Sequence, residues 1–289
     1  MSKKRNIKIL MIIISTLFVL LMLVFPLASV LVNSFSKGLE FYFNSLKTEY
    51  FFSALGLTCI VTFITVIVNS FFGIIASYLL TRYSFAGKHI LATLIDIPFS
   101  ISPVIAGLAF IMMFGRLGWA TPIIDTINSI TGWNIKIVFA IPGVVLATIF
   151  VTFPFVSREI IPVLNAVGTD EEEAAAIMGA SGFTIFRKIT FPHIKWALAY
   201  GVVLCSARAI GEFGAVNALS KTRGMTFTLP LEIDALYLSG SSDSIVAAYA
   251  VSSILVLVSV ILLVIRNILE YRSDRIKISV EERAEIKED

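Results

Sequence analysis

Charged residues are scarce in this sequence of 289 residues. Asp, Glu, Lys and Arg together make up 15% of the chain, whereas a soluble domain carries about 25%. Hydrophobic residues reach 57% of the sequence, and the mean hydropathy is +0.90. These values argue against a soluble globular protein and place the chain among integral membrane proteins.

The chain is also poor in residues that build redox, metal and nucleic-acid sites. Cys59 and Cys205 are its two cysteines, and both lie in apolar runs, where they behave as small hydrophobic residues. The two histidines, His89 and His193, are too far apart in the sequence to predict a metal site. The net charge is only +3, and no block of Lys and Arg alternates with aromatic residues, so nucleic acid is not an expected partner.

A phosphate-binding loop of the form G-x-x-x-x-G-K-[ST] is missing from the sequence. Any work driven by ATP would therefore fall to a partner, and we expect no cofactor in this chain. A Ser/His/Asp set, a zinc-binding spacing and a pair of catalytic carboxylates are missing as well. The sequence thus predicts no enzymatic activity of its own.

Long apolar runs dominate what is present, and six of them reach the length of about 20 residues that a bilayer requires. Each should be a helix, because a helix satisfies its own backbone hydrogen bonds in lipid. The first run resembles the core of a secretory signal peptide, but it is longer, and five further runs follow. The six runs are Ile9–Val32, Leu57–Leu80, Ile90–Phe114, Ile137–Val156, Ala197–Leu219 and Ile245–Ile265.

These runs predict an all-α, polytopic membrane protein with six transmembrane helices. Residues 1–56 would hold the first helix and an outer loop, residues 57–270 the main domain, and residues 271–289 a charged tail. With both termini placed in the cytoplasm, 16 of the 23 Lys and Arg residues fall on the inner side and six on the outer side. Because positive charge gathers on the cytoplasmic side, we expect this orientation.

The largest predicted cytoplasmic loop covers residues 158–196, and local rules predict a helix–turn–helix in it. Thr169 followed by Glu172 forms a capping box, and a run of four acids opens the helix. Gly179 falls where a helix stops with positive φ. A second short helix would follow, and Pro192 would end it. The small side chains on the exposed part would let another surface approach closely, although a solvated amphipathic connector would show the same pattern.

One motif in this loop resembles the EAA loop of bacterial ABC-importer permeases, whose pattern is EAA, three residues, Gly, nine residues and Ile-x-Leu-Pro. The chain matches the spacing throughout and differs only by Phe191 in place of Leu. The resemblance implies a type I ABC importer fold and a loop that docks on a dimer of separate ATPase subunits, which would hold ATP and Mg. The docking role falls to Glu173, Ala174, Ala175, Gly179, Ile189 and Pro192.

Four further segments resemble the sulfate/thiosulfate importer permeases, most closely their W-type subunit. They are IPFSISPVIAG (97–107), FVTFPFVSREIIP (150–162), SARAIGEFGAV (206–216) and RGMTFTLPLEI (223–233). The resemblance implies a multi-pass protein of a bacterial or archaeal cytoplasmic membrane, in contact with lipid, a second, T-type permease and an extracytoplasmic oxyanion-binding protein. Permeases for molybdate or tungstate share the general plan and remain the alternative, as does a homodimeric permease core. An independent channel would leave the matched loop without a purpose.

Arg208 and Glu212 lie four residues apart in the fifth run and are expected to share a helix face. Charges inside a span usually face a bundle interior or a cavity. Two interpretations remain open: the pair holds helices together, or Arg208 lowers the barrier for an anion in the translocation pathway while Glu212 holds it in place. Gly211 and Gly214 beside them would allow close helix contact or a break in the helix.

The third run holds Pro98 and Pro103, which should kink or interrupt its helix. Ser100 and Ser102 lie between the prolines and could offer hydroxyl donors to an oxyanion in the pathway, or could bond back to their own helix. Asp96 is expected near the cytoplasmic end of this run, where solvation or a salt bridge would satisfy its charge.

Overall fold

The structure is a computed structural model, which describes residues 2–288 and the side chains of residues 7–270. This described part is helical and contains no β-strand, as the apolar runs predicted. Its elements are α1 (Ser2–Val19), the π-helical turn η1 (Leu20–Val24), α2 (Phe25–Ser34), α3 (Gly38–Leu46), α4 (Glu49–Arg82), α5 (Lys88–Ser100), α6 (Pro103–Phe114), α7 (Thr121–Thr131), α8 (Ile141–Thr152), α9 (Pro154–Val167), α10 (Asp170–Ile177), α11 (Gly182–Ile185), the π-helical turn η2 (Phe186–Thr190), α12 (Phe191–Ile210), α13 (Gly214–Leu219), α14 (Leu229–Leu238) and α15 (Ser242–Glu288).

The core forms where α4, α9 and α12 pack together. Val156 of α9 is fully buried at the centre, and glycines on the two neighbouring helices let it approach closely. A Cβ atom at Gly73 of α4 would lie 2.9 Å from Cγ1 of Val156, and one at Gly201 of α12 would lie 3.1 Å from its Cα. Small residues at these crossings let the backbones come together, which is how helices pack in a membrane.

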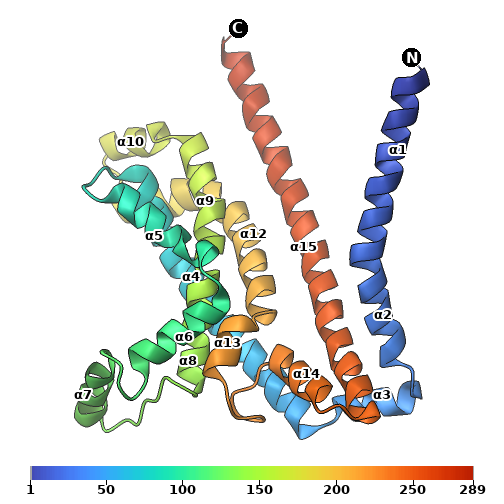
Figure 1. Cartoon of the computed structure of the whole chain (residues 1–289). Helices are drawn as coiled ribbons and strands as arrows, with labels where there is room; N and C mark the ends of the chain where they lie inside the picture. The colour runs from blue at the N-terminus through green and yellow to red at the C-terminus, as the bar shows by residue number, and fades with distance from the viewer. Residues whose placement is uncertain (1, 289) are drawn as a thin grey trace.

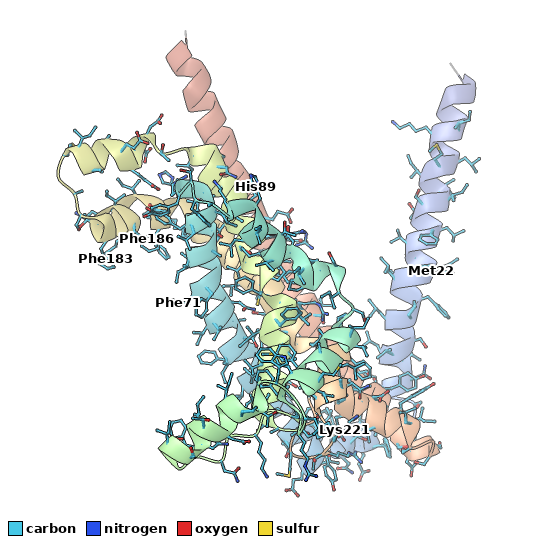
Figure 2. The ribbon with its side chains drawn as sticks, turned by 60° about the vertical axis from the view of Figure 1, so that its left-hand side comes forward. Met22, Phe71, His89, Phe183, Phe186 and Lys221 are labelled. Atoms are coloured by element: carbon cyan, nitrogen blue, oxygen red, sulfur yellow. The ribbon has the colours of Figure 1, made fainter. Side chains whose placement is uncertain are left out.

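The N-terminal helix stands apart from this core. α1, η1 and α2 form one apolar stretch, and the 18-residue window that identifies it as a possible span is 0% buried. Figures 1 and 2 both show α1 separated from the other helices, with contact to α15 only toward the end of α2. Its apolar surface is therefore left for lipid or for another protein.

Four helical stretches of the described residues are long and apolar enough to cross a membrane: Ile7–Ser34, Glu49–Arg82, Ile141–Val167 and Ser242–Glu270. The pair α5 and α6 adds a fifth span if the two bent halves count as one. The fifth predicted run is not continuous, because α12 ends at Ile210 and the chain becomes helical again at Gly214. The count of six transmembrane helices stays a prediction.

Element boundaries also differ from the predicted divisions of the chain. α4 begins at Glu49 rather than near Leu57, with the Thr48 side chain accepting a hydrogen bond from Phe51 N. The division at residue 56 therefore falls inside a helix. α15 likewise continues past residue 270. α10 lies at the same end of the molecule as the start of α1 and the end of α15, while α3, α7 and α14 lie at the other end (Figure 1).

The side of the membrane on which each end lies stays a prediction. Several of the charges that favour this orientation belong to side chains outside the described part, among them Lys3, Lys4, Arg5 and those of the predicted tail 271–289. Residues 1 and 289 lie outside it entirely.

Candidate functional site: the docking loop and two helix breaks

The helix predicted in the large loop is α10, and it begins where the sequence placed it. Thr169 is its N-cap residue, and Thr169 O accepts a hydrogen bond from Glu173 N at 2.9 Å. The predicted capping box is wrong, however, since the Thr169 side chain makes no capping hydrogen bond. The carboxylate of Glu172 turns away from the cap because a guanidinium from another helix binds it.

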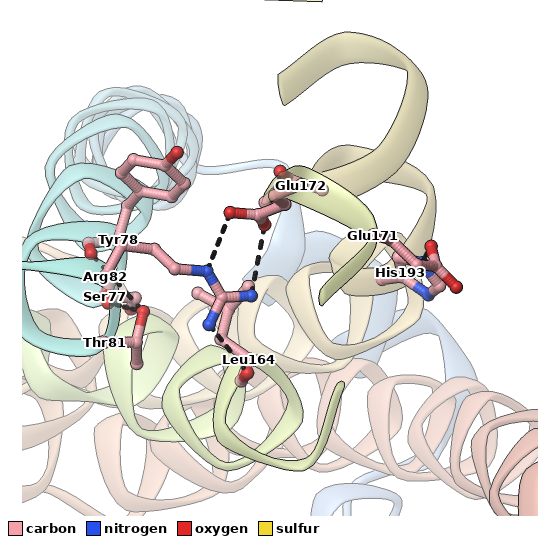
Figure 3. Close-up of polar contacts among 9 residues, drawn as sticks. Ser77, Tyr78, Thr81, Arg82, Leu164, Glu171, Glu172 and His193 are labelled. Atoms are coloured by element: carbon pink, nitrogen blue, oxygen red, sulfur yellow. Dashed lines mark hydrogen bonds and ion pairs between the residues drawn. The ribbon is translucent and has the colours of Figure 1, made fainter. Parts of the chain in front are cut away.

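Glu172 is the centre of a buried polar network that joins the loop to the membrane helices (Figure 3). Arg82, the last residue of α4, donates from Nε to Oε2 of Glu172 at 3.0 Å and from Nη2 to Oε1 at 3.1 Å. Its Nη1 donates to the carbonyl oxygen of Leu164 in α9 at 3.0 Å. Thr190 of η2 donates its hydroxyl to Oε1 of Glu172 at 2.9 Å. Four separate elements thus meet at one ion pair.

α10 ends at a glycine with positive φ, as predicted. Gly179 has φ +84°, and a Cβ atom there would meet nothing within 4 Å. The amide of Ala180 donates to the carbonyl oxygen of Ala175 at 3.0 Å, which satisfies one of the last helical carbonyls. Only the backbone conformation, and not the space around it, therefore demands glycine at this position.

The exposed surface of the loop differs in part from the predicted docking set. Glu173, Ala174 and Gly179 are exposed, but Ala175 is buried and serves packing within the chain. Three large apolar residues of the same loop, not singled out from the sequence, are the most exposed ones: Ile177 at 87%, Met178 at 81% and Phe183 at 74%. Figure 2 labels Phe183 at the edge of this loop. The signal that could have identified them is the presence of large apolar residues around the end of this helix, in a segment predicted to face water.

The second helix of the loop does not end at Pro192. The chain stays helical from Gly182 through η2 into α12, and Pro192 lies at the start of α12. A proline in the first turn of a helix costs little, because its missing N–H needs no partner there, and the π-helical turn just before it absorbs the change in hydrogen bonding. Ile189, inside that turn, is half-buried, and Pro192 is exposed.

Arg208 and Glu212 form an ion pair, but not on one helix face. Nη1 of Arg208 lies 2.5 Å from Oε2 of Glu212. Glu212 follows the end of α12 at Ile210, and its Oε1 accepts a hydrogen bond from Ala215 N at 2.8 Å. The Glu212 side chain is 1% exposed and that of Arg208 is 32% exposed. The carboxylate therefore ties the end of α12 to the start of α13, and the guanidinium partly faces open space.

The third predicted run is broken, as its prolines indicated. α5 and α6 meet at an angle of 110°, with Pro98 inside α5 and Pro103 in the first turn of α6. Ser100 and Ser102, at the bend, are exposed, and their hydroxyls make no hydrogen bond with any residue that the structure describes. The side chain of Asp96 accepts a hydrogen bond from Nε of Arg158 at 2.9 Å, so of the two predicted alternatives, solvation or a salt bridge, the structure has the salt bridge.

These two helix breaks lie against each other. A Cβ atom at Gly214 would lie 3.1 Å from Cβ of Pro103 and 3.2 Å from Cγ2 of Val104. Of the two glycines predicted to allow a break or a close contact, Gly211 lies at the break after α12 and Gly214 makes the close contact. Discontinuous helices that meet inside a membrane protein expose backbone groups and helix ends, which is the arrangement transporters use at substrate sites.

A second buried carboxylate, Glu232 of α14, lies toward the opposite end of the molecule from α10 and was not singled out from the sequence. Arg223 donates from Nε to Oε2 of Glu232 at 2.9 Å, and its guanidinium carbon lies 4.5 Å from the ring centroid of Tyr50 in α4. Glu232 is 1% exposed, whereas Arg223 is 38% exposed. The hydrogen bond to Glu232 raises the pKa of Arg223 above its ordinary value.

The described residues contain no group of three or more His, Cys, Asp and Glu side chains that could hold a metal ion. What the arrangement offers is an apolar and acidic surface at one end, a partly exposed guanidinium beside two helix breaks, and an ion pair with at least one buried side chain at each end of α4.

Comparison with known proteins gives a match to a family model. Residues 69–275 match the family described as binding-protein-dependent transport system inner membrane component. The chain is 43% identical over 263 residues to the sulfate transport system permease protein CysW of Synechococcus elongatus, covering 91% of this chain and 89% of that one. It is 42% identical over 255 residues to the CysW protein of Escherichia coli, with 86% and 83% covered.

A solved structure shares the fold. The crystal structure of a bacterial ABC transporter involved in the import of the acidic polysaccharide alginate superposes with a TM-score of 0.75, covering 95% of this chain and 97% of that chain. The sequence identity is 18%, so this likeness carries the fold alone.

Proposed function

Because the chain belongs to the family of binding-protein-dependent transport system inner membrane components, we propose that it is the permease subunit of an ATP-driven importer for sulfate and thiosulfate. The observation that carries the substrate class is the likeness to sulfate permeases over nearly the whole of both chains. That likeness favours sulfate over molybdate or tungstate. The chain forms half of the translocation pathway, and a T-type permease forms the other half.

The energy for transport comes from a dimer of ATPase subunits that carries ATP and Mg, and this chain contributes no cofactor. The docking surface for that partner comprises Glu173, Ala174, Gly179 and the exposed apolar residues Ile177, Met178 and Phe183. Large apolar side chains that are 74–87% exposed on a polar loop mark an interaction site. The acidic first turn of α10 keeps this surface soluble until the partner covers it.

The anion passes near the junction of the two helix breaks. Arg208 supplies a guanidinium there, and its partial exposure leaves donors free of Glu212. The exposed hydroxyls of Ser100 and Ser102 lie at the facing bend. A cation in a site of low dielectric lowers the barrier for a dianion. An extracytoplasmic oxyanion-binding protein delivers the substrate, and the chain resides in the cytoplasmic membrane of the cell.

Uptake by the reconstituted complex tests this function. The complex is purified through a tag on this chain, placed in liposomes containing ATP, and supplied with its binding protein and labelled sulfate. We expect ATP-dependent uptake that unlabelled thiosulfate inhibits and that molybdate at the same concentration leaves unchanged. Uptake of molybdate in preference to sulfate would overturn the substrate assignment, and uptake without ATP would overturn the importer.

A further inference from the structure

The docking helix α10 is attached to the rest of the molecule by few apolar contacts. Ala175 is its only buried side chain. A glycine with positive φ lies close to each end of the helix, Gly168 with φ +73° before it and Gly179 with φ +84° after it. A Cβ atom at either glycine would meet nothing within 4 Å. A short helix between two such glycines has hinges at both ends, so apolar packing and backbone geometry alone leave it free to swing.

Arg82 removes this freedom. Its side chain is 6% exposed, and the side chain of its partner Glu172 is 13% exposed. All three of its guanidinium nitrogens are engaged: Nε and Nη2 bind the carboxylate in a two-point contact, and Nη1 binds the carbonyl oxygen of Leu164. A two-point contact between a guanidinium and a carboxylate fixes direction as well as distance. The orientation of α10 is thereby set relative to both α4 and α9.

α4 can carry a displacement from this pair to the other end of the protein. It is one uninterrupted helix of 34 residues without a proline, which corresponds to about 50 Å. At its far end Tyr50 lies under the guanidinium of Arg223. The hydroxyl oxygen of Thr58 accepts a hydrogen bond from Leu229 N, the first residue of α14, at 2.9 Å. α4 thus touches the docking loop at one end and the α13–α14 connection at the other.

We propose that the Arg82–Glu172 ion pair makes α10 move as one body with α4 and α9, so that these two positioning residues couple the ATPase to the pathway. The inference rests on the proposed function and adds to it the residues that transmit the motion. Neither residue belongs to the matched docking motif. Without the pair, α10 would still bind the ATPase but would turn about Gly168 and Gly179 instead of moving α4.

The test compares transport with ATP hydrolysis in the reconstituted complex. The variants are Glu172→Gln, which keeps the shape and the Thr190 contact, and Arg82→Lys, which keeps the charge but loses the two-point contact. Glu171→Gln is the matched control, because Glu171 lies in the same helical turn and its side chain is 64% exposed beside His193. We expect Glu172→Gln to lower sulfate uptake per ATP about tenfold, as expected for loss of a charged hydrogen bond, with a smaller loss for Arg82→Lys and none for Glu171→Gln.

Two measurements distinguish the proposed coupling role of the ion pair from a purely structural role. First, the amount of ATPase that copurifies should stay unchanged in the variants. Second, the double variant Arg82→Ala/Glu172→Gln should lose no more sulfate uptake per ATP than Arg82→Ala alone, because the effects of two residues that act as a unit are not additive. Unchanged uptake per ATP in Glu172→Gln, or additive losses in the double variant, would overturn the proposal. The wild-type complex tests the proposed function separately, and if it transports another oxyanion, the same ratio measured with that anion still tests the pair.

Discussion

A Cβ atom placed on Gly107 would lie 2.7 Å from the carbonyl oxygen of Ala215. α6 and α13, the second halves of two broken helices, therefore pack with their backbones in contact. The Cβ atom of Ala218 lies 2.8 Å from the same position, so there is no room for a side chain at Gly107. This contact holds the bend of α5–α6 against the break after α12, where Arg208 and Glu212 lie.

Replacing Gly107 with alanine should force the two backbones apart. We expect a loss of about 1–3 kcal/mol in the free energy of unfolding, the usual cost of overpacking, measured by thermal unfolding of the purified protein in detergent. Gly56→Ala is the matched control, since a Cβ atom on Gly56 in α4 meets nothing within 4 Å. There we expect no loss, or a gain of up to about 1 kcal/mol from helix propensity. Equal stability of the two variants would contradict the backbone contact.

The exposed apolar side chains of the docking loop should decide how well the ATPase binds. Ile177→Ser and Phe183→Ser remove side chains that are 87% and 74% exposed, so neither change should lower the stability of the chain. We expect each to reduce the ATPase that copurifies, by a factor of about 10 for a contact that buries a large side chain. Ile130→Ser on α7, at a side chain 78% exposed and at the opposite end of the molecule, is the control. A normal yield of ATPase with both loop variants would place the docking surface elsewhere.

The turn after α10 should tolerate only glycine at one position. Gly179→Val forces a β-branched residue into positive φ, which costs about 1–2 kcal/mol even with open space around it. We expect normal membrane insertion but reduced sulfate uptake for each ATP hydrolysed. Gly182→Val, three residues on at a position with ordinary φ and open space, should keep a higher ratio of uptake to hydrolysis. A Gly179→Val complex with the wild-type ratio would refute the role of this turn.

Local rules predicted the elements whose causes are local. The bend of the third run follows from Pro98 and Pro103, and the stop of α10 follows from Gly179, because steric restrictions on single residues set both features. The break after Arg208 was foreseen as one of two outcomes for Gly211 and Gly214. The predicted capping box at Thr169 is wrong for a different reason. Glu172 could have bound the backbone N–H of Thr169 nearby, but its carboxylate binds the distant guanidinium of Arg82, and such a charged two-point contact is stronger.

Contacts between distant segments could not be predicted in the same way. Nothing in the sequence near Glu172 indicates Arg82, which lies 90 residues earlier. Glu232 stands in a segment recognised by its resemblance, yet its burial became visible only once Arg223 and Tyr50 were placed around it. Ala175 belongs to the matched motif, and only the packing of α10 on the following elements shows that its side chain points inward. The roles of the docking and pathway residues stay predictions until they are tested.

The ion pair of Arg223 and Glu232 should matter for stability through the carboxylate. Arg223→Ala leaves Glu232 buried and unpaired, and we expect it to cost about 1–3 kcal/mol in the free energy of unfolding. Adding Glu232→Gln removes the stranded charge, so the double variant should unfold at a higher temperature than Arg223→Ala alone. Lys221→Ala, at an exposed lysine of the same connection, is the control and should have no effect. A double variant less stable than the single one would show that the carboxylate has another partner.

The roles of Arg208 and Glu212 can be distinguished by substitution, because the two side chains make different contacts. Glu212→Ala removes both the ion pair and the hydrogen bond that Glu212 accepts from Ala215 N, so it should lower the yield of folded complex. Arg208→Ala removes a partly exposed cation and the ion pair, but leaves Glu212 the hydrogen bond that it accepts from Ala215 N. We expect it to leave assembly intact and to reduce anion uptake, with part of the uptake restored in Arg208→Lys, because lysine returns the charge without the two-dimensional fork of donors. Uptake of labelled sulfate, normalised to the amount of assembled complex, is the measurement. If Arg208→Ala abolished assembly instead, its guanidinium would serve the packing of α12 and α13 rather than the passage of the anion.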